Sequence, residues 1–590
     1  MDSGKKGLGS TAVYLILIIL VSFGVYSNTL GNGFVYDDHF QIENNPWIKD
    51  LSHFRDIFTS HVYGFKKELN TTNSYRPLLL VYYAFEYAMF GLKPWGWHFV
   101  NIILHTLNSL LVFFIASRII SKNGGEGRVY NFAPFFAAVI FAAHPVHSEA
   151  IAWVGCVTEL SYTFFYLSAF YLFISCNGIG VLAAAAFFFL LALLSKETAI
   201  TLPLVLLAYD LFSGERRFRI GELIKRYAPF TVSLFVYIAL RLTALKGVLP
   251  NQGLHTYLDQ TKVLINSAVF LAEYIKAIVL PIKFYPFNLF NPVYSIAEPK
   301  AILSVVFLIL VAIGIAALWL YRKRVNPFYL VFAVLFLITM LPALYIPGLS
   351  RHAFADRQAY LPSVWLILIV SLLVDKAGKG RNAVKAVSAV LILITALYSF
   401  ETIRRNSAWK NDLTIWQASA EAAEANYLAY LNIGIEYSIV GRPDDAIAFY
   451  KKSLDANLKR RDPDKPKVVV THMNIAKAYR SKNDLEGARI EFKEALKAEP
   501  ANLGALLGLA SVSEEMGLFD EAVSIYRQGL NFAQDPQAIK DINNAIGNSY
   551  ANRGMFSEAL ASYADALKIS PNDEVILSNM AQVRSLVGKR

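Results

Sequence analysis

The sequence predicts an all-α protein in two parts, a domain of many membrane-spanning helices followed by a solenoid of paired helices. The mean hydropathy of +0.39 and the 55% hydrophobic content are too high for a soluble chain of 590 residues. Many stretches approach the roughly 20 apolar residues that cross a bilayer. From residue 426 onward apolar runs are short, and basic and acidic residues balance at 21 each. The net charge of +11 therefore lies in the first part, where it indicates orientation rather than nucleic-acid binding.

The N-terminus predicts an uncleaved first span, because a basic flank precedes a long apolar run without a small-residue cleavage site. Further apolar runs follow along the first 405 residues. The candidate spans are 12–30, 97–117, 132–152, 158–175, 180–194, 198–212, 228–245, 263–282, 302–321, 327–346, 359–374 and 384–401.

The basic loops set the number of crossings. Basic connections belong on the cytoplasmic side, and twelve full crossings would place the loop at 321–324 on the wrong side. The segment 263–282 carries Glu273 and Lys276, so we expect it to be re-entrant or interfacial. About eleven crossings then place the C-terminal part on the same non-cytoplasmic face as the loop at 32–51.

The C-terminal part repeats a pattern of small residues, with Gly434, Ala476, Ala510 and Gly547 spaced 42, 34 and 37 residues apart. A period near 34 with small, aromatic and Pro landmarks is typical of tetratricopeptide repeats. We expect aromatic side chains to fill the seams, namely Tyr450, Phe492, Tyr526 and Tyr563. The predicted organisation is a membrane domain at 1–405, a linker helix at 406–425, and about four repeats plus a capping helix at 426–590. Such a solenoid offers a concave face to a peptide or partner protein.

Two adjacent carboxylates, Asp37 and Asp38, follow the first span within seven residues. A solvated loop would explain them, but a charged pair so close to a membrane favours a function. Two like charges raise one pKa, which favours a general base that takes a hydroxyl proton. The same pair could ligate a divalent cation, so the metal requirement stays open.

Other charged side chains belong to loops on the same predicted face. Arginine and lysine suit contact with a phosphate, and the candidates for the donor phosphate are Arg76, Lys196, Arg351 and Arg357. Snorkelling would equally explain Arg76, and pairing with Glu197 would explain Lys196. Candidate supporting residues are His144, His147, Glu149, Glu197, His352 and Asp356.

The pattern His144-x-x-His147-x-Glu149 could hold a metal, although a His–Pro step is a poor helical clamp. We favour two other interpretations: these side chains support a nearby site, or Pro145 simply ends the helix. For Asp356 a structural pair with an arginine is equally expected. The cysteines, Cys156 and Cys176, give no disulfide framework and no Cys-based metal site. Carboxylates and cations from five distant loops would suit a site that joins an acceptor hydroxyl to a lipid-borne, phosphate-activated donor.

Several stretches occur in an order that resembles a known family. They are "FVYDDHFQIENNP", "FAAHPVHSEAIAWV", "LLSKETAITLPLVLLAYDLF", "ADRQAYLPS" and "RRNSAWKNDLTIWQ", followed by the repeats. This set resembles the transmembrane and tetratricopeptide repeat-containing O-mannosyltransferases over nearly the whole chain. The stretch "GCVTELSYTFF" at 155–165 departs from the pattern, which leaves the sugar open.

The resemblance implies a polytopic membrane domain of the glycosyltransferase C type that uses polyprenyl- or dolichyl-phosphate sugars. It also implies a catalytic role for the acidic motif, with Asp37 the preferred base and Asp38 second. The expected reaction moves a sugar, mannose-like by resemblance, to Ser/Thr hydroxyls of exported proteins held on the repeats. A variant of this reaction has a lipid or glycan acceptor.

The alternative function is a membrane-anchored scaffold for envelope or secretion complexes, in which the loop charges are structural. The short repeat array and the single sequon at Asn70 favour a bacterial inner-membrane protein with periplasmic repeats. An endoplasmic reticulum membrane protein with luminal repeats is the alternative location.

Overall fold

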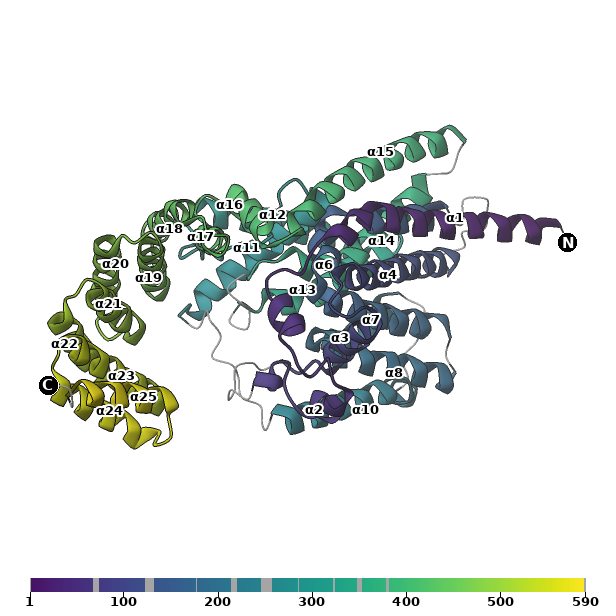
Figure 1. Cartoon of the computed structure of the whole chain (residues 1–590). Helices are drawn as coiled ribbons and strands as arrows, with labels where there is room; N and C mark the ends of the chain where they lie inside the picture. The colour runs from purple at the N-terminus through teal and green to yellow at the C-terminus, as the bar shows by residue number, and fades with distance from the viewer. Residues whose placement is uncertain are drawn as a thin grey trace. The chain divides into compact units, whose positions relative to one another are not determined.

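The computed structural model describes residues 2–66, 74–122, 132–176, 178–213, 220–245, 257–284, 286–321, 324–346, 353–377 and 381–587. The chain divides into two compact units, Met1–Ala418 and Ser419–Arg590 (Figure 1). Within these described ranges the regular elements are helices and no strand occurs. The predicted all-α class is confirmed.

The first unit contains the apolar helices and the loops between them. Its helices are α1 (Asp2–Tyr26), α2 (Phe54–Thr59), α3 (Pro77–Phe90), α4 (Pro94–Lys122), α5 (Phe132–Ala143), α6 (Ser148–Ala152), α7 (Val157–Ser175), α8 (Ile179–Ser195), α9 (Leu202–Phe212), α10 (Ile220–Leu245), α11 (Gln260–Val279), α12 (Pro299–Leu320), α13 (Phe328–Leu344), α14 (Tyr360–Ala377), α15 (Arg381–Asn406) and α16 (Asp412–Ala422), whose last turn crosses into the second unit.

By length and composition, seven stretches of the described chain could cross a membrane. They are Thr11–Gly31, Pro94–Lys122, Val154–Ser175, Gly221–Leu245, Pro299–Leu320, Asp356–Ala377 and Asn382–Trp409. The pair Phe132–Ala143 and Pro145–Ala152, bent by 47°, makes an eighth if it forms one span. The bend falls where Pro145 was expected to end a helix. The chain is therefore a polytopic membrane protein.

Three shorter apolar helices accompany these spans, α3, α8 and α13. Helix α3 was missing from the predicted spans because Glu86 interrupts its apolar run and Gly91 ends it. Gly91 has a φ of +59°, a conformation that glycine adopts at no steric cost. Helix α11 covers the segment predicted to be re-entrant and is not among the candidate spans, and its depth in the membrane stays a prediction.

One large hydrophobic cluster forms most of the core of the first unit, and large side chains such as Trp97, Tyr166 and Trp365 are fully buried in it. It also contains buried polar groups from distant helices. His105 on α4 contacts the Tyr360 hydroxyl at 2.7 Å and the Ala142 carbonyl oxygen at 3.0 Å. Such partners are what a buried histidine needs, so His105 is a packing residue that helps to join α4, α5 and α14.

The second unit consists of successive helices that pair along the chain (Figure 1). They are α17 (Tyr427–Ile439), α18 (Pro443–Leu458), α19 (Lys465–Ser481), α20 (Leu485–Ala498), α21 (Leu503–Glu515), α22 (Phe519–Leu530), α23 (Pro536–Asn552), α24 (Phe556–Ile569) and α25 (Glu574–Val587). The last helix lies where a capping helix was expected.

Small residues let the paired helices approach each other. A Cβ atom at Gly434 would lie 2.5 Å from the ring of Tyr450, and one at Gly547 would lie 2.5 Å from the ring of Tyr563. All four predicted seam aromatics are buried. The predicted seams are therefore confirmed. The predicted linker at 406–425 contains the last residue of α15, the short turn Ser407–Trp409 and helix α16.

Candidate functional site

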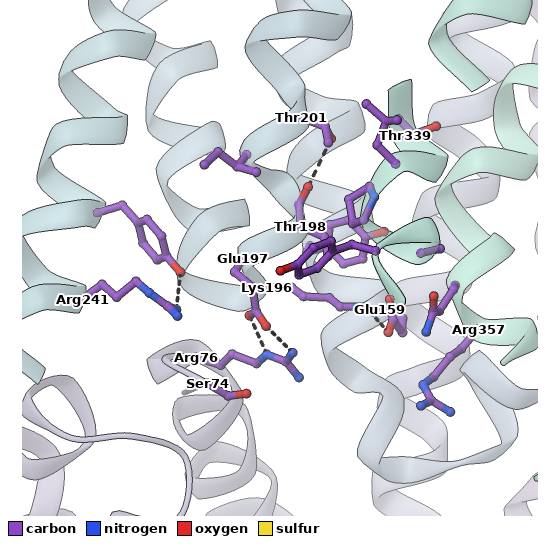
Figure 2. Close-up of a pocket in the computed structure, with 18 of the residues that line it drawn as sticks. Ser74, Arg76, Glu159, Lys196, Glu197, Thr198, Thr201, Arg241, Thr339 and Arg357 are labelled. Carbon is purple, nitrogen blue, oxygen red and sulfur yellow. Dashed lines mark hydrogen bonds and ion pairs between the residues drawn. The ribbon is translucent and has the colours of Figure 1, made fainter. Parts of the chain in front are cut away.

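A cavity of about 1010 Å³ lies in the first unit. Figure 2 shows it between segments that are far apart in the sequence: the residues before α3, helices α7, α10 and α13, and the turns before α9 and α14. The lining residues are Ser74, Arg76, Glu159, Tyr162, Lys196, Glu197, Thr198, Ile200, Thr201, Tyr237, Ile238, Arg241, Leu242, Thr339, Leu341, Pro342, Ala343, Tyr345, Arg357 and Gln358. Three of the four predicted phosphate-binding cations are among them.

Arg76 forms a bidentate ion pair with Glu197 in the wall of the cavity. Its Nε donates to Oε2 at 2.8 Å and its Nη2 donates to Oε1 at 2.7 Å (Figure 2). Burial raises the pKa of the Glu197 carboxyl, but the Arg76 guanidinium outweighs it and holds that pKa at about 2. Glu197 is therefore a carboxylate at neutral pH, and it orients the arginine at the cavity wall.

Lys196 pairs with Glu159 on α7 and not with its neighbour Glu197. The Lys196 ammonium also lies 5.3 Å from the centre of the Tyr162 ring. The backbone explains why the two neighbours separate. Lys196 is extended at the end of α8, and Glu197 begins a 3-10 turn. The two side chains therefore reach different partners while both line the cavity.

Arg357 reaches the cavity from the short turn that precedes α14. Its guanidinium pairs with Glu149, whose other carboxylate oxygen accepts the Arg357 backbone N–H at 3.0 Å. The guanidinium also lies 5.3 Å from the centre of the Trp153 ring. Glu149, predicted as a supporting residue, therefore fixes both the backbone and the side chain of Arg357.

Arg241 and Glu159 line the cavity and were not predicted. Arg241 Nη1 lies 3.4 Å from the Tyr237 hydroxyl oxygen, one turn earlier on α10. The signal available in the sequence was a single arginine within the apolar run at 228–245. Together the lining has four basic side chains and two acidic ones, so it carries a net positive charge.

Apolar side chains form another part of the cavity lining. Ile200, Ile238, Leu242 and Leu341 belong to it, and each is more than a third exposed. Exposed apolar side chains are usual where a membrane protein faces lipid chains. The cavity thus combines a cationic surface with an apolar one.

Asp38 is fully buried and hydrogen-bonded through both carboxylate oxygens. Oδ2 accepts the Val35 N–H at 3.1 Å, and Oδ1 accepts the Trp153 Nε1–H at 3.0 Å and the Gly155 N–H at 2.8 Å. Burial raises the pKa of Asp38 to about 8, although these hydrogen bonds act in the opposite direction. Asp38 therefore fixes the acidic loop to the segment before α7.

Asp37 has a different environment, since its carboxylate is partly exposed and accepts no hydrogen bond in the part of the chain that the structure describes. Burial raises its pKa, and the Arg357 guanidinium lowers it. Neither Asp37 nor Asp38 lines the cavity, but Asp37 interacts electrostatically with Arg357, which does line it. Asp37 is the member of the pair that is available to a substrate.

The remaining predicted residues have other surroundings. His144 Nε2 donates to the Ile278 carbonyl oxygen at 2.8 Å, and His147 Nδ1 lies 2.9 Å from the Phe141 carbonyl oxygen. Asp356 pairs with Arg405 at 3.7 Å. None of these three side chains lines the cavity. Their buried contacts stabilise the turns in which they lie. Arg351 and His352 lie outside the described residues.

The described residues contain no group of three metal-ligating side chains. Because Asp38 directs both oxygens at N–H donors, a cation held by both Asp37 and Asp38 does not fit this arrangement. The imidazoles of His144 and His147 likewise face protein atoms. The two cysteines are free.

The class of protein follows first from the repeats. Tetratricopeptide repeat models match residues 426–499, 479–542 and 541–573. The chain is thus a polytopic membrane protein with a tetratricopeptide repeat domain.

Relatives extend the similarity to the membrane unit. The protein O-mannosyl-transferase F38B6.6 of Caenorhabditis elegans is 25% identical over 472 residues, covering 77% of this chain and 64% of that protein. The protein O-mannosyl-transferase TMTC3 of Mus musculus is 21% identical over 633 residues, covering 96% of this chain and 65% of that protein. The human protein O-mannosyl-transferase TMTC1 is 33% identical over 227 residues, covering 36% of this chain and 25% of that protein.

These relatives confirm the resemblance to the TMTC-family protein O-mannosyl-transferases. The chain spans just under two thirds of the length of the two relatives that it matches over most of its own sequence.

Proposed function

We propose that this protein is an integral membrane glycosyltransferase that moves a sugar, mannose by similarity to the named relatives, from a polyprenyl- or dolichyl-phosphate carrier to Ser/Thr hydroxyls of exported proteins. The reaction takes place on the non-cytoplasmic face in this proposal. The repeats bind the acceptor polypeptide in this proposal.

One observation supports the proposal most strongly. Arg76, Lys196 and Arg357 come from three distant segments and line one cavity, and the Arg357 guanidinium acts to lower the pKa of Asp37, which burial raises. A transferase of this kind needs a base near the acceptor and cations near the phosphate. A scaffold has no need for this combination.

The cavity fits the two parts of such a donor. The four basic side chains suit the phosphate, and guanidinium groups bind its oxygens in pairs. The apolar lining of Ile200, Ile238, Leu242 and Leu341 suits the first isoprene units. Ion pairs such as that of Arg76 with Glu197 orient the basic side chains before the donor binds. Charges oriented in advance require little rearrangement during the reaction.

The chemistry is a substitution at the sugar C1 atom. Asp37 takes the proton of the acceptor hydroxyl, and the hydroxyl oxygen forms a bond to C1. The bond between C1 and the phosphate oxygen breaks, and its electron pair stays on that oxygen. The leaving polyprenyl phosphate gains negative charge, which Arg76, Lys196 and Arg357 stabilise.

Asp38 supports this reaction through the backbone. Its hydrogen bonds to Val35, Trp153 and Gly155 hold the loop on which Asp37 lies. A divalent cation, if one takes part, would find one oxygen ligand at Asp37, with the remaining ligands from the donor phosphate or water. The described residues offer no group of three His, Cys, Asp or Glu side chains that could hold such a cation.

Mass spectrometry of exported proteins tests the proposal. Cells with the wild-type chain, without it, and with Asp37→Asn are compared for hexose-modified Ser and Thr residues. We expect hexose on exported proteins in the wild-type cells alone. Equal modification in all three would contradict the proposal, and full rescue by residues 426–590 attached to an unrelated single span would favour the scaffold.

A further inference from the structure

Asp412, the first residue of α16, contacts the acidic loop with both carboxylate oxygens. Oδ1 accepts the Tyr36 backbone N–H at 2.8 Å, and Oδ2 lies 2.7 Å from His39 Nε2. Tyr36 and His39 lie on either side of the pair Asp37–Asp38 in the sequence. One side chain, 375 positions away from Asp37, therefore holds the backbone before the proposed base and the His39 imidazole after it.

His39 is held from two directions. Its Nδ1 lies 2.6 Å from Glu43 Oε2, and its Nε2 faces Asp412. Carboxylates accept hydrogen bonds, so both ring nitrogens donate and the ring is an imidazolium. Burial lowers the pKa of His39, but Glu43 and Asp412 outweigh it and raise it to about 9. The ion pair between His39 and Asp412 thus exists at neutral pH.

Tyr36 has a backbone conformation that needs support. Its φ is +55°, in the left-handed region that a bulky residue rarely adopts. Strain of this kind persists when the surroundings hold it, and it is frequent at functional sites. The Tyr36 ring packs against Phe287 at 4.6 Å, Trp416 at 5.7 Å and Trp153 at 5.8 Å between centroids.

The residues just before Asp412 contact the acidic loop at two further points. Gly33 N–H donates to the Lys410 carbonyl oxygen at 2.9 Å. Asn32 Nδ2 donates to the Asn406 carbonyl oxygen at 3.2 Å. The loop from Asn32 to His39 therefore runs along residues 406–416, and Asp412 is the point where a charged side chain fixes it.

We infer that Asp412 is a positioning residue for Asp37: it holds Tyr36 and His39 so that the Asp37 carboxylate faces the acceptor hydroxyl. This inference rests on the proposed function, because it requires Asp37 to act as the base. Asp37 itself has no hydrogen bond to hold its carboxylate within the described chain, so its direction depends on the backbone. Residues 406–416, which lie within the linker helix predicted at 406–425, thereby become part of the site.

The variants are made in the full-length chain in nanodiscs. The donor is a short-chain polyprenyl-phosphate mannose, and the acceptor is a peptide around a Ser or Thr that mass spectrometry finds modified. We expect Asp412→Ala to lower kcat about 100-fold, since a displacement of about 1 Å has effects of that size. KM for the donor stays unchanged because the cavity cations are untouched. Asp412→Asn keeps an acceptor for the Tyr36 N–H, so its kcat falls less, about tenfold by the same reasoning.

A double-mutant cycle separates positioning from a general effect on folding. If Asp412 acts through Asp37, adding Asp412→Ala to Asp37→Asn causes little further loss of kcat, because coupled residues are non-additive. Glu421→Gln, an exposed carboxylate on the same helix, is the matched control and keeps wild-type kcat.

The inference alone would be overturned by a wild-type kcat in Asp412→Ala, or by losses that multiply independently in the double variant. A loss of kcat that merely follows a lower thermal unfolding midpoint in Asp412→Asn would also contradict it. A wild-type chain that binds the donor but transfers no sugar would instead overturn the proposed function, and this inference with it.

Discussion

The ion pairs of the two units differ in what surrounds them. In the membrane unit, Arg357 and Glu149 are 18% and 1% exposed. In the repeats, Arg480 and Glu515 are 44% and 35% exposed. Exposed pairs contribute about 0–1 kcal/mol, and buried charges cost several kcal/mol to desolvate unless they are well paired. Charges that a membrane unit keeps at this cost indicate a function, whereas the charges of the repeats are ordinary for a solvated surface.

The largest effect is expected where one partner of a buried pair is removed. Arg357→Met leaves Glu149 buried without its cation, which costs about 3–5 kcal/mol of stability, and it removes a proposed contact to the donor phosphate. Thermal unfolding in detergent measures the first effect, and transfer from the polyprenyl-phosphate donor measures the second.

A double variant separates these two effects. Glu149→Gln combined with Arg357→Met removes the unpaired carboxylate that Arg357→Met alone leaves buried. We therefore expect the unfolding midpoint to return most of the way to that of the wild type, while the rate of sugar transfer stays low. Transfer at the wild-type rate in this double variant would show that Arg357 serves only the fold.

Arg241→Met is expected to have a smaller effect, which is confined to binding of the donor. Losing a hydrogen bond to a charged group costs about 1.5 kcal/mol or more, roughly a tenfold rise in KM for the donor. The unfolding midpoint should change little, because Arg241 is only partly buried and lies at the surface of the cavity. Lys300→Met, at an exposed position on α12, is the control. An unchanged KM in Arg241→Met would remove this arginine from the donor site.

The pH dependence of stability tests the pair of Arg76 and Glu197. The pKa of Glu197 is about 2 in the folded chain, below its ordinary value of 4.5. The carboxylate therefore stabilises the fold fully above pH 4.5, and this contribution is lost as the pH falls toward 2. We expect the difference in unfolding midpoint between wild type and Arg76→Met to shrink over that window. A constant difference across the window would mean that the pair does not set this pKa.

The smallest effect is expected in the repeats. Arg480→Gln removes an exposed pair and should cost no more than about 1 kcal/mol, without any change in kcat or in KM for the donor. Calorimetry of the full-length protein and the transfer assay check both expectations. A fall in kcat would show that this surface pair contributes to the reaction.

The sequence predicted the fold class and the seams of the repeats because both depend on local patterns. Long apolar runs predict spans, and glycine opposite an aromatic predicts a close helix pair, as Gly434 and Tyr450 show. The sequence also pointed to Arg76, Lys196 and Arg357, since each lies in a charged loop beside an apolar run.

Other parts of the site depend on contacts between distant segments. The different surroundings of Asp37 and Asp38 arise from Trp153 and Gly155, more than 100 positions away. The partner of Lys196 is Glu159 because the chain turns sharply after α8. Arg241 is a single arginine within the apolar run at 228–245, and Asp412 lies beyond the last span in the stretch "RRNSAWKNDLTIWQ", which carried the family resemblance but no signal for a site residue.

The central claim is that Asp37 is the catalytic base while its buried neighbour Asp38 holds the loop. Transfer by the full-length protein with Asp37→Asn, together with binding of the polyprenyl-phosphate mannose donor, tests this claim most directly. We expect kcat to fall by about 10²–10⁴-fold, the contribution of a general base, with donor affinity and the unfolding midpoint unchanged. A kcat within a few-fold of wild type would contradict the account.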